Sequence, residues 1–252
     1  MTSSVREDRT TFINTQNHNR SISVTEWGVD SSIGLVRKEN QDSWGQSNEQ
    51  LFVVADGMGG TPGGADASRL AVEGLIAADP RIGWMKVLEG LNKAVRDGSA
   101  ELGLPRAGTT LVAIAVEPRR VFTLHVGDSR IYRLRGTALQ QLTTDHSLRE
   151  LRIEEGKVAD EPDSRGSLHA ITSFIGSRQL RQRMDVGTIS IEPGDRLLLC
   201  SDGIHNAMPT PLLNHLLSDG TCAEAASRLV ETAELNGGRD NATALIVDLD
   251  VR

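Results

Sequence analysis

Short hydrophobic runs recur along this chain, and most of them end at Gly, Asp or Pro. Runs rich in Val, Ile, Leu and Thr with such boundaries are typical of β-strands. Strands are therefore predicted at residues 21–29, 51–55, 109–116, 121–126, 131–134, 186–191, 196–200 and 242–249. The three strands between residues 109 and 134 are joined by short turns, which predicts an antiparallel meander covered by helices.

Helical spacing of apolar residues appears between these strands. The clearest pattern runs from Cys222 to Ala233, where Thr221 and Glu224 predict a capping box. The glycines at 237 and 238 are expected to end this helix. Three more helices are predicted: at residues 65–77, across residues 84–95, and from Pro211 with Thr210 as its cap.

The amino-acid composition limits the kinds of molecule that this protein is expected to bind. The chain carries 34 acidic against 27 basic residues and only 3% aromatic residues, which argues against nucleic acid as a partner. No apolar run is long enough to span a membrane and no signal peptide is visible, so a cytoplasmic location is expected. Cys200 and Cys222 lie in apolar surroundings and are expected to be buried, reduced thiols.

Residues 1–20 are polar and lack periodicity, which predicts a flexible arm. Residues 21–252 contain no linker or repeat and are expected to form a single domain.

Aspartates stand at the ends of four predicted strands. Each Asp-Gly or Asp-Asn pair, taken alone, is more often a turn than a ligand. Because the end of one antiparallel strand lies beside the start of the next, Asp56, Asp202 and Asp240 could meet on one edge. A divalent cation would remove their mutual repulsion, and Mg²⁺ or Mn²⁺ prefers oxygen ligands. The four pairs are Asp56-Gly57, Gly127-Asp128, Asp202-Gly203 and Asp240-Asn241.

Six short segments occur in an order that resembles the metal-dependent type 2C protein serine/threonine phosphatases, with the bacterial branch the most similar. They are 34–42 (GLVRKENQD), 54–60 (VADGMGG), 125–130 (HVGDSR), 142–148 (LTTDHSL), 195–203 (DRLLLCSDG) and 238–243 (GRDNAT). The resemblance covers residues 21–249. It implies an α+β fold with a central antiparallel β-sandwich flanked by helices, in four layers α-β-β-α.

The resemblance also implies a chemistry. Two Mn²⁺ or Mg²⁺ ions would be bridged by Asp56, with the Gly57 carbonyl, Asp202 and Asp240 as further ligands. Asp128 resembles the aspartate that helps to hold a third, weaker metal. A shared water would then hydrolyse phosphoserine or phosphothreonine in proteins phosphorylated by a cognate kinase. We expect the enzyme to be a monomer.

The resemblance gives three more residues a role. Arg37 would grip the phosphate, and Asp42 would orient a metal-bound water, with Asn241 supporting the ligands from behind. Two positions depart from the family pattern. Gln41 stands where many members have glutamate, and Met58 replaces a histidine proposed as general acid in animal members. A thioether cannot donate a proton, so the proton for the leaving group must come from elsewhere.

The segment 154–177 corresponds to the variable flap near the site and matches the family only loosely, with Ser173 where arginine is frequent. The six histidines do not suggest a ligand set. His125 is expected to be packed or hydrogen-bonded, His146 to lie near a helix start, and His205 either to approach the site or to end a helix.

Two readings from other classes remain open. A GDS-type serine esterase would use Ser129 as nucleophile, with His205 and Asp202 in its D-x-x-H spacing. The esterase hypothesis gives no role to the segments 34–42, 54–60 and 238–243. A non-catalytic binding module on the same fold should have lost a metal aspartate, and none is lost. A two-metal nuclease is a weaker competitor because the chain is acidic and poor in aromatic residues.

Overall fold

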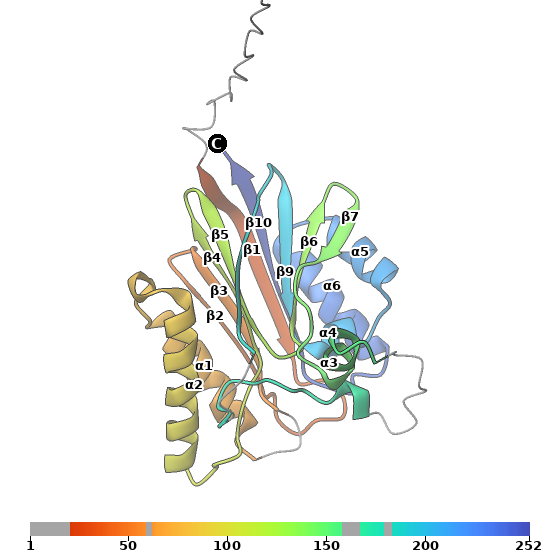
Figure 1. The fold of residues 1–252 in the computed structure, drawn as a ribbon. Coiled ribbons are helices and arrows are strands. Elements are labelled where there is room, and N and C mark those ends of the chain that lie inside the picture. The colour runs from red at the N-terminus through yellow and green to blue at the C-terminus, as the bar shows by residue number, and fades with distance from the viewer. Residues whose placement is uncertain (1–20, 59–61, 158–166, 179–182) are drawn as a thin grey trace, which may run out of the picture.

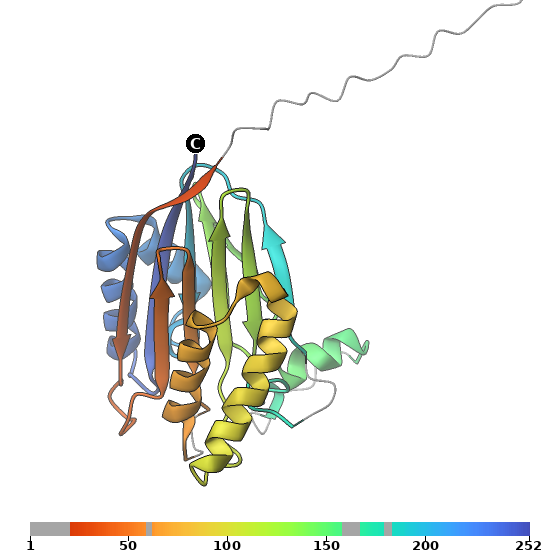
Figure 2. The same cartoon turned by 90° about the vertical axis from the view of Figure 1, so that its left-hand side faces the viewer.

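The computed structural model describes residues 21–58, 62–157, 167–178 and 183–252. Two five-stranded antiparallel sheets face each other at its centre (Figures 1 and 2). One sheet has the order β1 (Ile22–Ser32), β10 (Ala242–Val251), β9 (Asp195–Cys200), β6 (Arg130–Arg135) and β7 (Ala138–Gln141). The other has the order β2 (Asp42–Ser47), β3 (Leu51–Asp56), β4 (Leu111–Glu117), β5 (Arg120–Val126) and β8 (Asp185–Ile189).

Helices complete a four-layer arrangement. The sheet with β3 is covered by α1 (Gly64–Ile76) and α2 (Trp84–Glu101). The sheet with β9 is covered by α4 (Asp202–His205), α5 (Thr210–Ser218) and α6 (Cys222–Leu235). The other elements are α3 (Leu148–Glu154) and the 3-10 turns η1 (Pro80–Ile82) and η2 (Ser167–His169). Among the described residues, no helix combines the length and the apolar character that crossing a bilayer requires.

Strand β3 shows why the central strands are continuously apolar. Phe52 and Val54 point into the space between the sheets, whereas Val53 and Ala55 point toward α1 and α2. Successive side chains alternate between the two faces of a strand, so a strand buried on both faces needs apolar residues at every position. Strand β9 follows the same rule.

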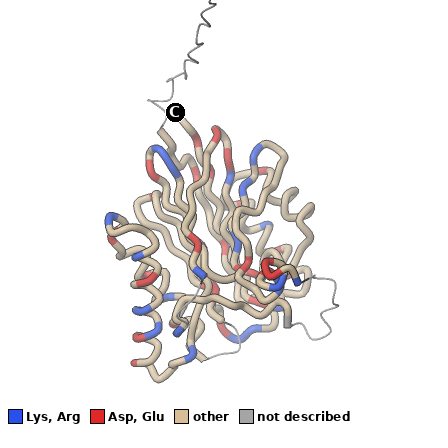
Figure 3. Tube along the Cα trace, viewed as in Figure 1, with Lys and Arg blue, Asp and Glu red and all other residues tan. Residues whose placement is uncertain are grey.

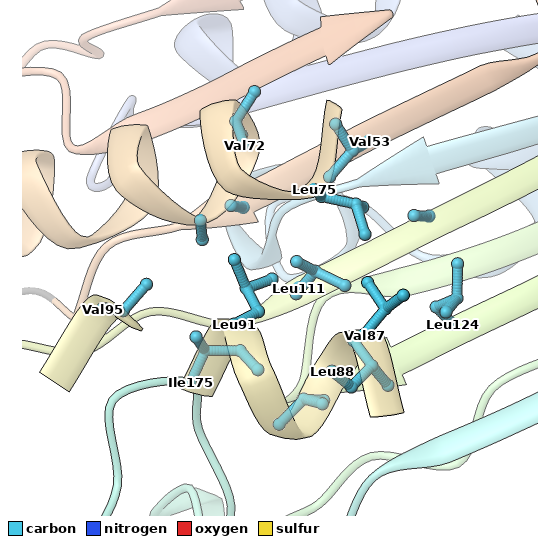
Figure 4. Packing of buried hydrophobic residues seen from close by; sticks show 14 of the residues in the cluster. Val53, Val72, Leu75, Val87, Leu88, Leu91, Val95, Leu111, Leu124 and Ile175 are labelled. Carbon is cyan, nitrogen blue, oxygen red and sulfur yellow. The ribbon is translucent and has the colours of Figure 1, made fainter. Parts of the chain in front are cut away.

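The outer layer on the β3 side is held by one apolar face of α2. Val87, Leu88, Leu91 and Val95 pack against Leu75 of α1 and against the strands beneath (Figure 4). These residues recur at helical spacing, so one side of the helix is buried while the other is solvated.

Strand β6 does not follow β5 in the same sheet. The chain leaves β5 at Val126 and enters the opposite sheet at Arg130, where β6 pairs with β9. The predicted three-strand meander is therefore wrong, although β4 and β5 pair as expected. Gly127 makes the crossing with a φ of 110°, a conformation that glycine adopts at little cost. Asp128 and Ser129 are carried across the end of the sandwich by this crossing.

Two strands escaped prediction, and both lie at sheet edges. Strand β2 (DSWGQS) and strand β7 (ALQQ) have one neighbour each, and they lack the apolar runs of the central strands. The capping box of Thr221 and Glu224 at α6 is confirmed. Thr210 is not a cap: it is the first helical residue of α5, and Pro209 occupies the cap position.

The predicted fold class, an α+β sandwich flanked by helices, is confirmed. Cys200 and Cys222 are buried free thiols, also as predicted. The flexible arm proposed for residues 1–20 lies outside the described residues, and the assignment of 21–252 to one domain stays a prediction.

Candidate active site

Strand β3 ends, and α4 and β10 begin, at one end of the sandwich (Figure 1). Three aspartates from distant parts of the chain converge there. Asp56 is the last residue of β3, Asp202 is the first residue of α4, and Asp240 immediately precedes Asn241 and β10. The carboxyl groups of Asp56 and Asp202 lie within hydrogen-bonding reach, and Asp240 is close enough to repel Asp202. We expected a single sheet edge. Asp56 instead ends β3 of one sheet, whereas Asp202 follows β9 and Asp240 precedes β10 of the opposite sheet, so the three meet across the sandwich.

The electrostatics of this end are those of crowded carboxylates. Burial, and then the charges of Asp42, Asp202 and Asp128, raise the pKa of Asp56 well above its ordinary value. Burial and Asp240 raise the pKa of Asp202 to about 6. Such a cluster favours either protons or a cation, because ionised carboxylates crowded together repel one another. An all-oxygen donor set of this kind fits a hard divalent cation such as Mg²⁺ or Mn²⁺.

Asp42 lies behind Asp56, its direct partner in the β2–β3 pairing. Its Oδ2 accepts hydrogen bonds of 2.7 Å from the hydroxyls of Ser201 and Thr243, so one oxygen joins β2 to the opposite sheet. Its Oδ1 is buried, with no hydrogen-bond partner among the described residues. Burial raises the pKa of Asp42 to about 6. An orphan acceptor at this place fits a water held by a cation, since buried polar atoms are normally paired.

Two glycines let the backbone come close at this end. A Cβ at Gly57 would lie 2.3 Å from the Gly64 carbonyl oxygen and 2.7 Å from that of Gln41. A Cβ at Gly203 would lie 1.9 Å from the Asn241 carbonyl oxygen. Both positions therefore exclude any larger residue, and the Asp-Gly pairs seen in the sequence have a steric cause.

Arg37 reaches the cluster from the connection between β1 and β2. Its Nη2 donates a 2.6 Å hydrogen bond to Asp240 Oδ2, and the charges of Asp202 and Asp56 also act on it. Asn241 holds this connection in place. Its side-chain oxygen accepts from the Gln41 amide at 2.9 Å, and its side-chain nitrogen donates to the carbonyls of Ile33 and Glu39.

Asp128 approaches the same end from the β5–β6 crossing. Burial, and then the charge of Asp202, raise its pKa to about 7. His205, in α4, hydrogen-bonds through Nε2 to the Asp128 carbonyl oxygen at 3.0 Å. Ser129 is fully buried, and its hydroxyl hydrogen-bonds to Thr110 at 2.7 Å. A buried hydroxyl that has no imidazole partner among the described residues cannot act as the nucleophile of a serine esterase.

A cavity of about 420 Å³ lies beside the carboxylates. Its lining includes Asp202, Asp240, Asn206, Glu234 and Arg239. Its position leaves room for a substrate group to reach the cluster from the α6 side.

Among the described residues, the potential ligand atoms that lie closest together are not those of these aspartates. Three ligand atoms lie within 4.8 Å of one another only at His125, His146 and Asp185, and at Glu26, Cys222 and Asp248. A centre with two ions and bound waters needs wider spacing than a single ion does. The histidine group was not foreseen, because its members are spread over residues 125–185 of the sequence and come together only in the fold.

Sequence reasoning placed Asp56, Asp202, Asp240, Asp128, Asp42 and Arg37 in one region, and the structure brings them together. It missed Ser201 and Thr243, the two donors to Asp42. Both lie inside segments that carried the resemblance, yet only the three-dimensional arrangement shows what their hydroxyls contact.

The fold and the acidic end together define a four-layer protein with a carboxylate-rich centre. The family model described as protein phosphatase 2C matches residues 36–233, and the chain belongs to this family. The predicted family is thereby confirmed.

Named relatives agree with this assignment. The chain is 33% identical over 239 residues to the serine/threonine protein phosphatase PstP of Mycobacterium tuberculosis, covering 90% of this chain and 45% of PstP. It is 33% identical over 235 residues to the serine/threonine phosphatase stp of Listeria monocytogenes, covering 86% of this chain and 93% of that one. The chain thus spans about half the length of the first relative and nearly all of the second.

Solved structures show the same architecture. The catalytic domain of the serine/threonine protein phosphatase PstP, in complex with two manganese ions, superposes with a TM-score of 0.71 at 32% identity. The match covers 92% of this chain and 99% of that structure.

Proposed function

We propose that this chain is a metal-dependent protein serine/threonine phosphatase, which hydrolyses phosphoserine and phosphothreonine in proteins and so opposes a kinase. The observation that carries this proposal is the convergence of Asp42, Asp56, Asp128 and Asp202 beside Arg37, with pKa values raised by burial and by one another. The family and the phosphatase relatives support it.

Two Mn²⁺ or Mg²⁺ ions are proposed at this end. Asp56, the Gly57 carbonyl, Asp202 and Asp240 would hold them, and Asp128 would help to hold a third, weaker ion. The two manganese ions in the PstP structure support this number. Divalent ions at this place would lower the pKa of a shared water and neutralise charge on the phosphoryl oxygens.

Side chains of the protein would bind the phosphate and orient the attacking water. Arg37 would exchange its contact with Asp240 for the phosphate oxygens, because its planar fork suits two parallel hydrogen bonds. The orphan Oδ1 of Asp42 would accept a hydrogen bond from the attacking water and so orient it. Met58 has no proton to donate, so the leaving oxygen would take its proton from water.

The decisive experiment is hydrolysis of a phosphothreonine peptide with Mn²⁺ or Mg²⁺. We expect activity to disappear on chelation and to fall by at least about 10³-fold in Asp202→Asn, since metal stabilisation amounts to several kcal/mol. Asp248→Asn is the matched control, because Asp248 lies near the other end of the same sheet and binds Arg196. Activity that survives chelation would contradict the proposal.

Two further assays separate the competing functions. Labelling by a serine-directed fluorophosphonate that Ser129→Ala abolishes would favour the esterase. A protein that binds phosphopeptide but takes up no Mn²⁺ in calorimetry would be a binding module. Cytoplasmic location, a monomeric state and a cognate kinase stay predictions.

A further inference from the structure

His125, His146 and Asp185 form a group of titratable side chains that the proposed reaction does not use. They come from β5, from the turn before α3 and from the first residue of β8. Both histidines are 2% exposed. Asp185 Oδ2 lies 3.1 Å from His146 Nε2 and 3.8 Å from His125 Nδ1, and the two rings are 4.4 Å apart.

At first sight these atoms suggest a second metal site, but the hydrogen bonds of His146 oppose it. The Gly127 amide donates to His146 Nδ1 at 3.2 Å, so Nδ1 carries a lone pair. In a neutral imidazole the proton is then on Nε2, which donates it to Asp185. A cation bound at Nε2 would need the lone pair of that nitrogen, so the ring proton would move to Nδ1. The Nδ1 hydrogen would then face the amide hydrogen of Gly127, and their hydrogen bond would be lost. Arg183 Nε also occupies both oxygens of Asp185, at 3.1 and 3.2 Å.

The protonation state fits this hydrogen-bond pattern. Burial, and then the neighbouring His125, lower the pKa of His146 to about 4. Burial would raise the pKa of Asp185, but the facing His125, Arg183 and His146 outweigh it and hold this pKa below its usual range. At neutral pH the pair is therefore a neutral imidazole that donates to a carboxylate.

On its other side His146 holds the peptide that precedes Asp128. Its backbone amide donates to the Gly127 carbonyl at 2.7 Å, while its ring accepts from the Gly127 amide. Both polar groups of Gly127 are thus bound by one residue. Gly127 has a φ of 110° and makes the crossing between the sheets, so its orientation determines where Asp128 points.

The same histidine is connected to the base of the α3–β8 connection, which contains most of the segment 154–177 that the resemblance assigns to the variable flap. The His146 carbonyl accepts from Thr172 at 2.7 Å. Arg183, which binds Asp185, also pairs with Glu154 at 2.6 Å and so joins the end of α3 to the start of β8. A continuous set of polar contacts therefore leads from Glu154 through Arg183, Asp185 and His146 to Gly127.

We propose that His146 is a positioning residue: as the neutral Nε2–H tautomer it ties the base of the α3–β8 connection to the Gly127–Asp128 turn and thereby sets the affinity of Asp128 for its cation. This inference deepens the proposed function. Its test by metal binding needs no substrate, so it can fail or succeed independently of the phosphatase activity.

Two substitutions separate the two sides of the ring. In His146→Asn, the side-chain oxygen replaces Nδ1 and keeps an acceptor for Gly127, but contact with Asp185 is lost. In His146→Gln, the amide nitrogen reaches the place of Nε2 and keeps a donor for Asp185, but the acceptor for Gly127 is lost. Asp128→Asn identifies which Mn²⁺ binding step in calorimetry belongs to Asp128.

We expect His146→Gln to weaken that step by about 10- to 100-fold, the usual effect of residues that support metal ligands, with the tighter steps unchanged. His146→Asn should weaken it less. In the Asp128→Asn background, His146→Gln should have no further effect. Equal weakening of all steps, or no change in either variant, would overturn the proposal. The proposal would also be overturned if the Asp128→Asn variant kept every Mn²⁺ binding step of the wild type.

The wild-type protein provides a second measurement that does not depend on folding of the variants. Nitrogen NMR of the His146 ring should show a neutral Nε2–H tautomer at pH 7. A Nδ1–H tautomer or an imidazolium would refute the assignment. Stoichiometric Zn²⁺ binding that both His146→Asn and His146→Gln abolish would show a cation site instead, which also refutes it.

Discussion

Strands β9 and β10 carry aspartates near both of their ends, but the aspartates at the two ends differ in whether an arginine binds them. At the end nearer the C-terminus, Arg135 binds Asp195 with two hydrogen bonds of 2.8 Å, and Arg196 binds Asp248 with bonds of 2.7 and 2.8 Å. Acidic positions in red accordingly occur at both ends of the strands (Figure 3). At the other end, no arginine forms such a two-bond pair with Asp56, Asp128 or Asp202 in the described chain.

The difference separates structural from functional carboxylates. Asp195 is fully buried, yet its charge is balanced by a fixed guanidinium and by the Glu192 amide. At the acidic end, like charges raise one another's pKa. Among the described residues, Arg37 makes a single contact, to Asp240, and Arg130 acts on Asp128 from a distance while its own two-bond pair is with Asp145. Perturbed carboxyl groups without a permanent counter-ion are typical of functional sites. The missing positive charge is what a divalent cation would supply.

The sharpest test of this contrast exchanges one carboxylate at each end. Asp56→Asn should lower phosphatase activity by at least about 10³-fold, because the proposed bridging ligand is lost. In metal-free protein it should raise the melting temperature, since a repulsive charge is removed. Asp248→Asn should lower the melting temperature and leave the chemistry intact. If both variants changed activity and stability in the same way, the contrast between the ends would be wrong.

Removing one arginine at each end sharpens the same contrast through stability. Arg135→Met leaves the buried Asp195 without its counter-ion, which should cost about 3 kcal/mol in urea unfolding. Arg37→Met should change stability by about 0.5 kcal/mol or less, because Arg37 and Asp240 are each 35% exposed and water replaces the contact. Equal losses in the two variants would mean that Arg37 has a structural role.

How far the sequence predicts this molecule depends on where its signals lie. The central strands are buried on both faces, so their Val, Ile and Leu runs identify them. Edge strands β2 and β7 lack that signal and were missed. The β5–β6 crossing was missed because a short turn between two apolar runs looks the same whether or not the chain changes sheets. That crossing is nevertheless what brings Asp128 to the site.

The site shows the same limit. Asp56, Asp202 and Asp240 are visible in the sequence as Asp-Gly and Asp-Asn pairs after or before apolar runs. The hydroxyls of Ser201 and Thr243 on Asp42 are not, because serine and threonine occur in many turns and only register across two sheets brings them to one oxygen. His146 is hidden for the same reason, since its contacts lie 19 and 39 residues away.

The smallest predicted effect concerns pH in the metal-free protein. Burial raises the pKa of Asp42 from 3.8 to about 6, so the fold is stabilised by the bound proton below pH 4 and loses this contribution as pH rises through 6. His146 and His205 act in the opposite direction, because burial lowers the pKa of each to about 4. A bare melting curve would mix these contributions.

Comparing wild type with Asp42→Asn in a chelator isolates the carboxyl group, because the histidines are common to both proteins. The melting temperature of the wild type minus that of the variant should be highest near pH 4 and fall toward pH 7, because the folded protein loses the proton of Asp42 in this window. A saturating divalent cation should abolish the fall, since it replaces the proton as the counter-charge of the cluster. A difference that stays constant from pH 4 to pH 7 in the chelator would contradict a proton bound to Asp42 in the folded protein.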